Sequence, residues 1–154
     1  MKMDYIQDIR HKIGHEPIIL NFAGGILTNN KNEVLLQKRS DTNKWGLPGG
    51  AMEYGETVEG TCRREFREET GLEVTLNSFL GLSSNHIQHY PNNDVAQTIV
   101  TFFLVNYCKG ELHSKNEETL DLKYFSKENL PEIFNPQHAR CLQHYFDHDY
   151  PYFE

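Results

Sequence analysis

The sequence predicts a single α/β domain in which helices cover the faces of a mixed β-sheet. Its length of 154 residues is typical of one ordinary domain. Strand-like apolar segments occur before and after one central charged helix, and a second helix closes the chain. We therefore expect one domain over residues 1–154, in which residues 1–16 form an N-terminal helical extension.

The first elements are predicted to be a helix followed by a β-hairpin. Residues 4–14 place four apolar side chains on roughly one side of a helix, which favours an amphipathic helix. The apolar segment 17–28 is predicted to be a buried strand, and 33–39 its returning hairpin strand after the polar turn 29–32. Residues 40–50, "SDTNKWGLPGG", contain glycine and proline and are expected to form a loop.

The second half is predicted to contain three strands and a closing helix. Residues 72–84 alternate like a strand, whereas 85–94, "NHIQHYPNND", are polar and predict a loop or hairpin tip. Residues 96–108 give the strongest strand pattern of the chain, and 120–126 predict a shorter strand. Residues 135–146 are predicted to be helical, because an asparagine and a proline stand at their start.

The charge and the cysteines narrow the class of protein. A formal net charge of −7 argues against binding of long nucleic acid, but metal ions could provide positive charge for a small phosphorylated substrate. The three cysteines form no CxxC pair, which disfavours a zinc ribbon and is typical of a reducing compartment. The polar start and the lack of an apolar run of ~20 residues predict neither a signal peptide nor a membrane span. We therefore expect a cytoplasmic protein without a membrane partner. The sequence does not decide whether the protein forms a homodimer.

The central helix carries three carboxylates on one side. Residues 57–70 are predicted to be helical, and Gly71 suits the C-terminal cap. Glu65, Glu68 and Glu69 stand at spacing i, i+3 and i+4, which places them within about 100° of one another. We expect this side to pack on the protein, because the least polar residues of the helix lie there too.

Two interpretations of these carboxylates compete. Arg63 and Arg67 lie on the opposite side, so a solvated helix with ion pairs of ~0.2–0.5 kcal/mol each does not explain the inward carboxylates. Buried together, three carboxylates repel one another, and a divalent cation would offset that cost. Oxygen ligands alone select a hard cation such as Mg²⁺ or Mn²⁺ over zinc. The helix therefore favours a metal site.

The spacing around this helix resembles a known motif. Gly50 is followed by five residues, Glu56, seven residues and then "REFREETGL", Arg64 to Leu72. This pattern resembles the Nudix box at every defining position, and the preceding "VLLQKR" and "WGLPGG" also resemble the family. The resemblance implies the αβα sandwich fold of Nudix hydrolases. It also implies Mg²⁺- or Mn²⁺-dependent cleavage of a nucleoside diphosphate linked to another group X, by water attack at phosphorus. The partner implied is thus a small phosphorylated nucleotide.

The resemblance assigns roles to residues of the box. Glu65, Glu68 and Glu69 match the metal-binding glutamates, and the Gly49 carbonyl matches a common backbone ligand. Glu68 and Glu69 are also candidates for the catalytic groups. Arg64 matches the arginine that orients the glutamates.

The catalytic base stays open between the box helix and a later loop. In the family it comes from either place. The segment "NEETLDLKYF" offers Glu117 and Glu118, and Glu118 is preferred because its distance from Tyr124 and Phe125 resembles the family's arrangement. The competing interpretation is that both are surface charges of a loop.

Four residues outside the box are candidate substrate contacts. Arg39 ends the strand "VLLQKR". Trp45 precedes "GLPGG", where stacking on a base competes with packing on the loop. His86 and Tyr90 lie in the polar segment 85–94, where the family often places substrate contacts.

The sequence does not choose the substrate. Nucleotide sugars, oxidised nucleoside triphosphates, dinucleoside polyphosphates and capped RNA ends all remain candidates, although the acidic charge disfavours long RNA. The alternative function is a catalytically inactive Nudix-fold module that binds a nucleotide or a protein. Such modules usually lose box glutamates, and this chain keeps them.

Overall fold

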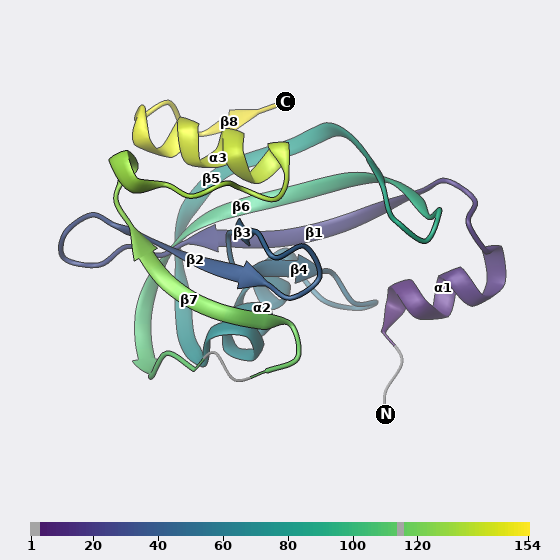
Figure 1. Ribbon diagram of the computed structural model, residues 1–154, viewed down its shortest axis with the longest axis horizontal. Coiled ribbons are helices and arrows are strands. Elements are labelled where there is room, and N and C mark those ends of the chain that lie inside the picture. The colour runs from purple at the N-terminus through teal and green to yellow at the C-terminus, as the bar shows by residue number, and fades with distance from the viewer. Residues whose placement is uncertain (1–3, 114–115) are drawn as a thin grey trace.

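The computed structural model describes residues 4–113 and 116–154 (Figure 1). Twelve elements follow one another in this part of the chain. They are α1 (Tyr5–Ile13), β1 (Ile18–Ile26), β2 (Val34–Arg39), β3 (Trp45–Gly46), β4 (Gly49–Ala51), α2 (Val58–Thr70), β5 (Leu72–His89), β6 (Val95–Gly110), β7 (Thr119–Phe125), the 3-10 helix η1 (Lys127–Asn129), α3 (Pro136–Phe146) and β8 (Tyr152–Phe153). Within these described residues, the structure contains no helix of the length and apolar character that crossing a bilayer requires.

The strands form two sheets between helices, where the sequence predicts one mixed sheet. The larger sheet has the order β4-β1-β6-β5-β8, and the smaller has the order β3-β2-β7. β1 pairs parallel with β6, whereas β5 pairs antiparallel with β6, so the larger sheet is mixed. In Figure 1, α3 lies above the strands and α2 below them. The predicted α/β fold with a mixed sheet flanked by helices is therefore confirmed.

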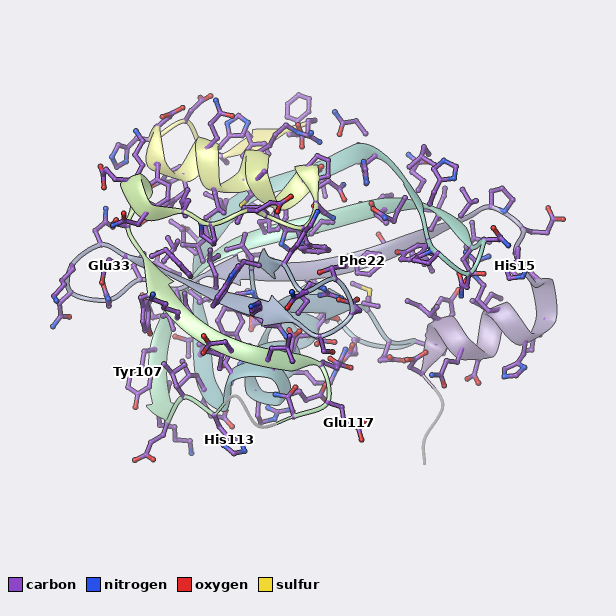
Figure 2. All side chains as sticks on the ribbon, in the orientation of Figure 1. His15, Phe22, Glu33, Tyr107, His113 and Glu117 are labelled. Atoms are coloured by element: carbon purple, nitrogen blue, oxygen red, sulfur yellow. The ribbon has the colours of Figure 1, made fainter. Side chains whose placement is uncertain are left out.

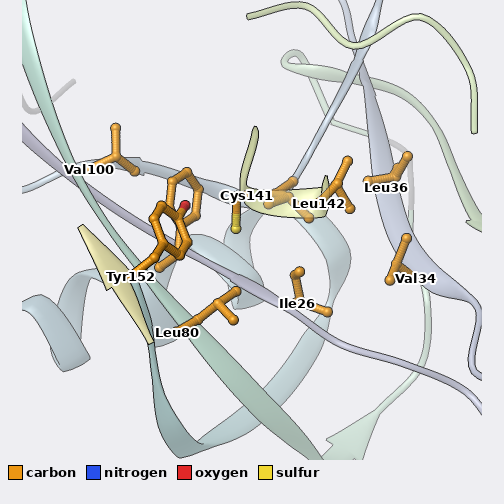
Figure 3. Close-up of a cluster of buried hydrophobic side chains, with 10 residues drawn as sticks. Ile26, Val34, Leu36, Leu80, Val100, Cys141, Leu142 and Tyr152 are labelled. Atoms are coloured by element: carbon orange, nitrogen blue, oxygen red, sulfur yellow. The ribbon is translucent and has the colours of Figure 1, made fainter. Parts of the chain in front are cut away.

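Two apolar clusters hold the layers together. The first joins the larger sheet and β2 to α3, and Figure 3 shows its side chains meeting between these elements. Its buried members are Ile26, Val34, Leu36, Leu47, Leu80, Val100, Phe102, Cys141, Leu142 and Tyr152. The second places Cys62 and Phe66 of α2 against the other side, with Leu72, Val74 and Phe103 among their partners. Both clusters exclude water from the sheets, so the sheets provide a rigid frame for the ends of their strands.

The predicted hairpin of 17–28 and 33–39 is present only next to its turn, where the Leu35 N–H donates to the Leu27 carbonyl and the Asn29 N–H to the Glu33 carbonyl, and its pairing does not continue along the strands. β1 and β2 belong to different sheets, and a single bridge between Thr28 and Val34 joins them. β1 pairs with β4 and β6, whereas β2 pairs with β3 and β7. The apolar pattern marks both strands as buried, but it does not indicate which partners they take.

Two predicted loops are shorter than expected. The segment 40–50 contains β3 and the start of β4. Within 85–94, residues up to His89 continue β5, and the turn comprises only Tyr90 to Asp94. Polar residues can extend β5 because their backbone pairs with β6, as His86 does with Thr98.

The N-terminal helix packs against this hairpin tip. Asp4 caps α1 by accepting a hydrogen bond from the Gln7 N–H. The Arg10 guanidinium donates to the Val95 carbonyl at 2.9 Å and lies 3.5 Å from the Asp94 carboxylate. In Figure 1, α1 lies beside the hairpin that joins β5 and β6. The division into one domain with an extension over 1–16 stays a prediction.

Candidate active site

The central helix begins and ends where the sequence predicts. The Thr57 side chain accepts a hydrogen bond from the Gly60 N–H and starts α2, while Gly71 ends it with a left-handed φ of 79°. Between these caps, Thr61, Cys62 and Phe66 are buried against the sheet. This packing fixes the rotation of the helix about its axis, and therefore the direction of its carboxylates.

Only two of the three box glutamates that were expected to face inward are buried. Glu65 is 9% exposed and Glu69 is 2% exposed, but the Glu68 side chain is 56% exposed. The expectation for Glu68 was wrong because it lies at the edge of the packed side, where no strand covers it. Its carboxylate contacts Arg64 at 3.1 Å instead.

A third carboxylate joins the two buried ones. Carboxylate oxygens of Glu65, Glu69 and Glu118 all lie within 4.8 Å of one another. Glu118 comes from the segment just before β7 and is exposed, so the group opens to solvent on one side. Three oxygen donors at this separation, without a nitrogen or sulfur donor among them, fit a hard cation such as Mg²⁺ or Mn²⁺.

Burial makes these carboxylates reluctant to ionise. Burial raises the pKa of Glu65 to about 7, against the opposing effect of the nearby Arg64. Burial, with a smaller contribution from the charge of Glu65, raises the pKa of Glu69 well above its usual value. Carboxylates that are costly to charge in an empty site are stabilised when a divalent cation arrives.

Arg64 connects the glutamates of the box. Its Nε donates to Glu56 at 2.7 Å, and one terminal nitrogen donates to Glu65 at 2.9 Å and to Glu68 at 3.1 Å. The other terminal nitrogen donates to the Ala51 carbonyl at 3.0 Å. Hydrogen bonding to Arg64 lowers the pKa of Glu56 to about 2, so Glu56 stays charged. This arginine therefore fixes three carboxylates relative to the backbone of β4.

Two glycines of β4 lie directly against the buried carboxylates. The Gly49 N–H donates to Glu69 at 2.8 Å. A Cβ atom at Gly50 would collide with the carboxyl group of Glu65. An alanine at position 50 would therefore displace the Glu65 carboxyl group from its present position.

The carboxylates lie in a cleft of ≈ 470 Å³. That volume lies in the range of about 300–1,000 Å³ that is usual for ligand pockets. Gly49, Glu65, Glu69 and Glu118 line it, together with Arg39 and Tyr90 of the predicted substrate contacts. Trp45 and His86 are not among the described residues that line the cleft.

Trp45 and His86 make other contacts. The Trp45 ring packs edge-on against Phe125 at 4.8 Å between centroids, next to the apolar cluster under α3. His86 points along β5 and its Nε2 hydrogen-bonds Gln88 at 2.9 Å. The expectation that they contact the substrate finds no support in their positions.

Arg39 and Tyr90 do reach the cleft. The Arg39 guanidinium binds Asp41 through two hydrogen bonds of 3.0 and 2.8 Å and lies 4.6 Å over the Phe134 ring. Burial lowers the pKa of Arg39, but the hydrogen bonds and charge of Asp41, with smaller contributions from the charges of Glu69 and Glu118, raise it overall. A permanent positive charge thus stands beside the carboxylate group.

Several residues of the cleft were not expected from the sequence. Phe22 comes from β1 (Figure 2), and Phe134 and His138 come from the start of α3. His138 is half-buried, and burial lowers its pKa to about 3, so its ring is neutral. Its Nδ1 accepts the Leu47 N–H at 3.0 Å, which leaves the proton on Nε2. For His138, the only signal was the run "NPQH" at the start of α3, and it was interpreted as a helix start.

Carboxylates from α2 and from the loop before β7 thus line one open cleft beside the Arg39 guanidinium. Residues 21–145 match the family model described as the NUDIX domain. The chain therefore belongs to the Nudix hydrolase family, which acts on pyrophosphate bonds and typically depends on a divalent metal. The predicted family is thus confirmed.

Individual relatives are moderately similar. An ADP-ribose pyrophosphatase of Methanocaldococcus jannaschii is 31% identical over 112 residues, which cover 71% of this chain and 63% of that protein. The chain thus spans less than two thirds of this archaeal relative. An 8-oxo-dGTP diphosphatase of Proteus vulgaris is 31% identical over 100 residues, 62% of this chain and 84% of that protein. A crystal structure of a NUDIX hydrolase from Nitrosomonas europaea superposes with a TM-score of 0.72 at 24% identity, covering 91% of this chain and 78% of that one.

Proposed function

We propose that this chain is a metal-dependent pyrophosphohydrolase that cleaves the diphosphate of a nucleoside diphosphate linked to a group X. The observation that carries the proposal is the group of Glu65, Glu69 and Glu118 in a cleft that also contains Arg39. Buried carboxylates alone would repel a diphosphate, so a bound cation is needed before such a substrate enters.

The residues that would hold the cation follow from the geometry. Glu65 and Glu69 face the cleft from the buried side, and Glu118 faces it from the loop before β7. The Gly49 carbonyl is a further candidate, and Glu68 could bind a second cation from the exposed edge of α2. A bound Mg²⁺ or Mn²⁺ would offset the charge of the diphosphate and lower the pKa of the attacking water.

Glu118 is the proposed catalytic base, through the carboxylate oxygen that is not directed at the cation. Its side chain is exposed while its carboxylate stays within 4.8 Å of the two buried ones, so water reaches it directly. As the water oxygen bonds to phosphorus, Glu118 takes a proton from that water, and the bond from phosphorus to the bridging oxygen breaks. Arg39 remains positively charged beside this point and is proposed to hold a phosphate of the substrate.

The remaining part of the cleft suits a nucleoside. Phe22, Phe134 and Tyr90 provide apolar and aromatic surface beside Arg39. Aromatic rings stack on bases without strong sequence preference, at ~1–3 kcal/mol per base. The relatives named for ADP-ribose and 8-oxo-dGTP make these two compounds the first substrates to test.

The experiment is a hydrolysis panel on the purified chain with and without cation. We expect release of a nucleoside monophosphate from ADP-ribose, 8-oxo-dGTP, a nucleotide sugar, a dinucleoside polyphosphate or a capped RNA, with Mg²⁺ or Mn²⁺ present and not with EDTA. Glu69→Gln should lower kcat by ~10²-fold or more, as expected for a lost metal ligand. Glu59→Gln is the matched control, because Glu59 lies exposed on the first turn of the same helix. Turnover that neither EDTA nor Glu69→Gln reduces would refute the proposed function.

A further inference from the structure

The segment that leads into β7 is anchored on the C-terminal end of α2. The His113 N–H donates to the Thr70 carbonyl at 2.8 Å. The Asn116 side chain donates to the Glu68 and Glu69 carbonyls at 3.5 and 3.3 Å. All three carbonyls belong to the last turn of the helix, where carbonyls lack intrahelical partners. The anchor therefore uses acceptors that α2 leaves free.

The same Asn116 side chain also holds the backbone of the third carboxylate residue. Its Oδ1 accepts the Glu118 N–H at 3.0 Å. On the other side, Ser40 donates its N–H to the Glu118 carbonyl at 3.0 Å and its hydroxyl to the Glu117 carbonyl at 2.8 Å. The backbone N–H and carbonyl of Glu118 are thus both held. The Glu117 side chain points away from the body of the protein (Figure 2).

A buried polar pair supports the next residue. Thr119 accepts a hydrogen bond from the Gln37 amide at 2.7 Å and donates to the Glu69 carbonyl at 3.4 Å. Both side chains are almost fully buried. The segment therefore meets α2 once through Asn116 and again through Thr119, on either side of Glu118.

These contacts oppose a force that the site itself creates. Glu118 approaches two buried carboxylates within 4.8 Å, and it repels each of them once that carboxylate has lost its proton. An exposed loop residue would otherwise turn into water. Holding its backbone on the helix that carries Glu65 and Glu69 keeps the three oxygens together before any cation binds.

We propose that Asn116 is a positioning residue that sets Glu118 against the carboxylates of α2, through its bridge from the helix end to the Glu118 N–H. The inference rests on the proposed function, in which Glu118 acts on the attacking water. A displacement of about 1 Å at a reacting group can cost ~10²-fold in rate, so the bridge acts on the chemical step more than on substrate binding.

The test is a double-mutant cycle between positions 116 and 118. Asn116→Ala should lower kcat by ~10–10²-fold while KM changes less than ~3-fold. In a Glu118→Gln background, the same substitution should add less than ~2-fold, because the group that it positions is already gone. Ser40→Ala, which removes a second tether of the same segment, should lower kcat in the same direction. Asn77→Ala is the control, since Asn77 is exposed on β5 and hydrogen-bonds only Asn106 among the described side chains.

A second readout needs no turnover. Mn²⁺ titration of the substrate-free protein should show weaker binding in Asn116→Ala than in Asn77→Ala, with thermal melting confirming that both variants are folded. If Glu118→Gln is as active as the unmodified chain, the base assignment fails, whatever Asn116 does. If Glu118→Gln is strongly impaired but Asn116→Ala lowers kcat by the same factor in both backgrounds, the positioning proposal is overturned. Unchanged kcat and unchanged Mn²⁺ affinity in Asn116→Ala would overturn it as well.

Discussion

The stability of the metal-free protein should fall as the pH rises through the titration of Glu65. An unfolded glutamate ionises near pH 4.5, whereas burial holds the proton of folded Glu65 until about pH 7. The stabilisation from the protonated group is fully present below 4.5 and is lost as the pH rises to 7. The shift of about 2.5 units, at 1.36 kcal/mol per unit, corresponds to ~3 kcal/mol.

A second buried group opposes this change and must be separated from it. His138 has a folded pKa of about 3, below the usual 6.5, so it destabilises the fold as the pH falls below 6.5. The two effects nearly cancel between pH 4.5 and 6.5 in the unmodified chain. Comparing the unmodified chain with Glu65→Gln removes the contribution of His138, because both proteins contain it.

Urea denaturation in EDTA between pH 5 and 8 measures the difference. We expect the unfolding free energy of the unmodified chain, relative to Glu65→Gln, to drop by ~3 kcal/mol over this range. Glu69, whose pKa is raised in the same direction, is present in both proteins, so its own contribution also cancels from the comparison. Glu59→Gln should show no such relative change. A difference between the unmodified chain and Glu65→Gln that stays constant from pH 5 to 8 would refute the reasoning.

Three further substitutions test the description of the site. Arg64→Met removes the guanidinium group that pairs with Glu56 and Glu65. Because the Arg64 side chain is only 20% exposed, we expect the free energy of unfolding in EDTA to fall by ~3 kcal/mol. A loss of less than ~1 kcal/mol, measured by urea denaturation, would mean that these ion pairs contribute no more than solvent-exposed ones. Trp45→Phe should change KM by less than ~2-fold relative to the unmodified chain, because the ring packs outside the cleft. Steady-state kinetics measures this, and a tenfold rise in KM would show that Trp45 contacts the substrate. Gly50→Ala should abolish Mn²⁺ binding, because its methyl group takes the space of the Glu65 carboxyl, and calorimetric titration with unchanged affinity would contradict this.

Local signals in the sequence were enough for the central helix. Its N-cap, its left-handed terminal glycine and the buried positions of Glu65 and Glu69 all depend on residues within one helix length. Glu68 was misplaced because a helical wheel gives angles but not the edge of the covering sheet. Whether the side chain at a given angle is buried depends on strands that come from elsewhere in the chain.

The walls of the cleft depend on distant segments, and this is where prediction from the sequence failed. Phe22 and His138 reach the cleft only because β1 and the start of α3 meet there. Trp45 and His86 looked equally suitable, since an aromatic or imidazole side chain in a polar segment fits either a contact or a packing role. Strand register decides between these roles, and one residue of register reverses the direction of a side chain.

The close approach of Gly50 to Glu65 affects how sequences of this type should be sorted into active and inactive chains. If Gly50→Ala loses Mn²⁺ as predicted, a chain can keep every glutamate of the box and still lose its cation through a single added methyl group. Counting acidic residues alone would then classify a catalytically inactive protein as an enzyme. The same substitution also offers an experimental tool, because it preserves every charged side chain of the cleft. Gly50→Ala would be the control that separates the loss of the cation from the loss of a carboxylate.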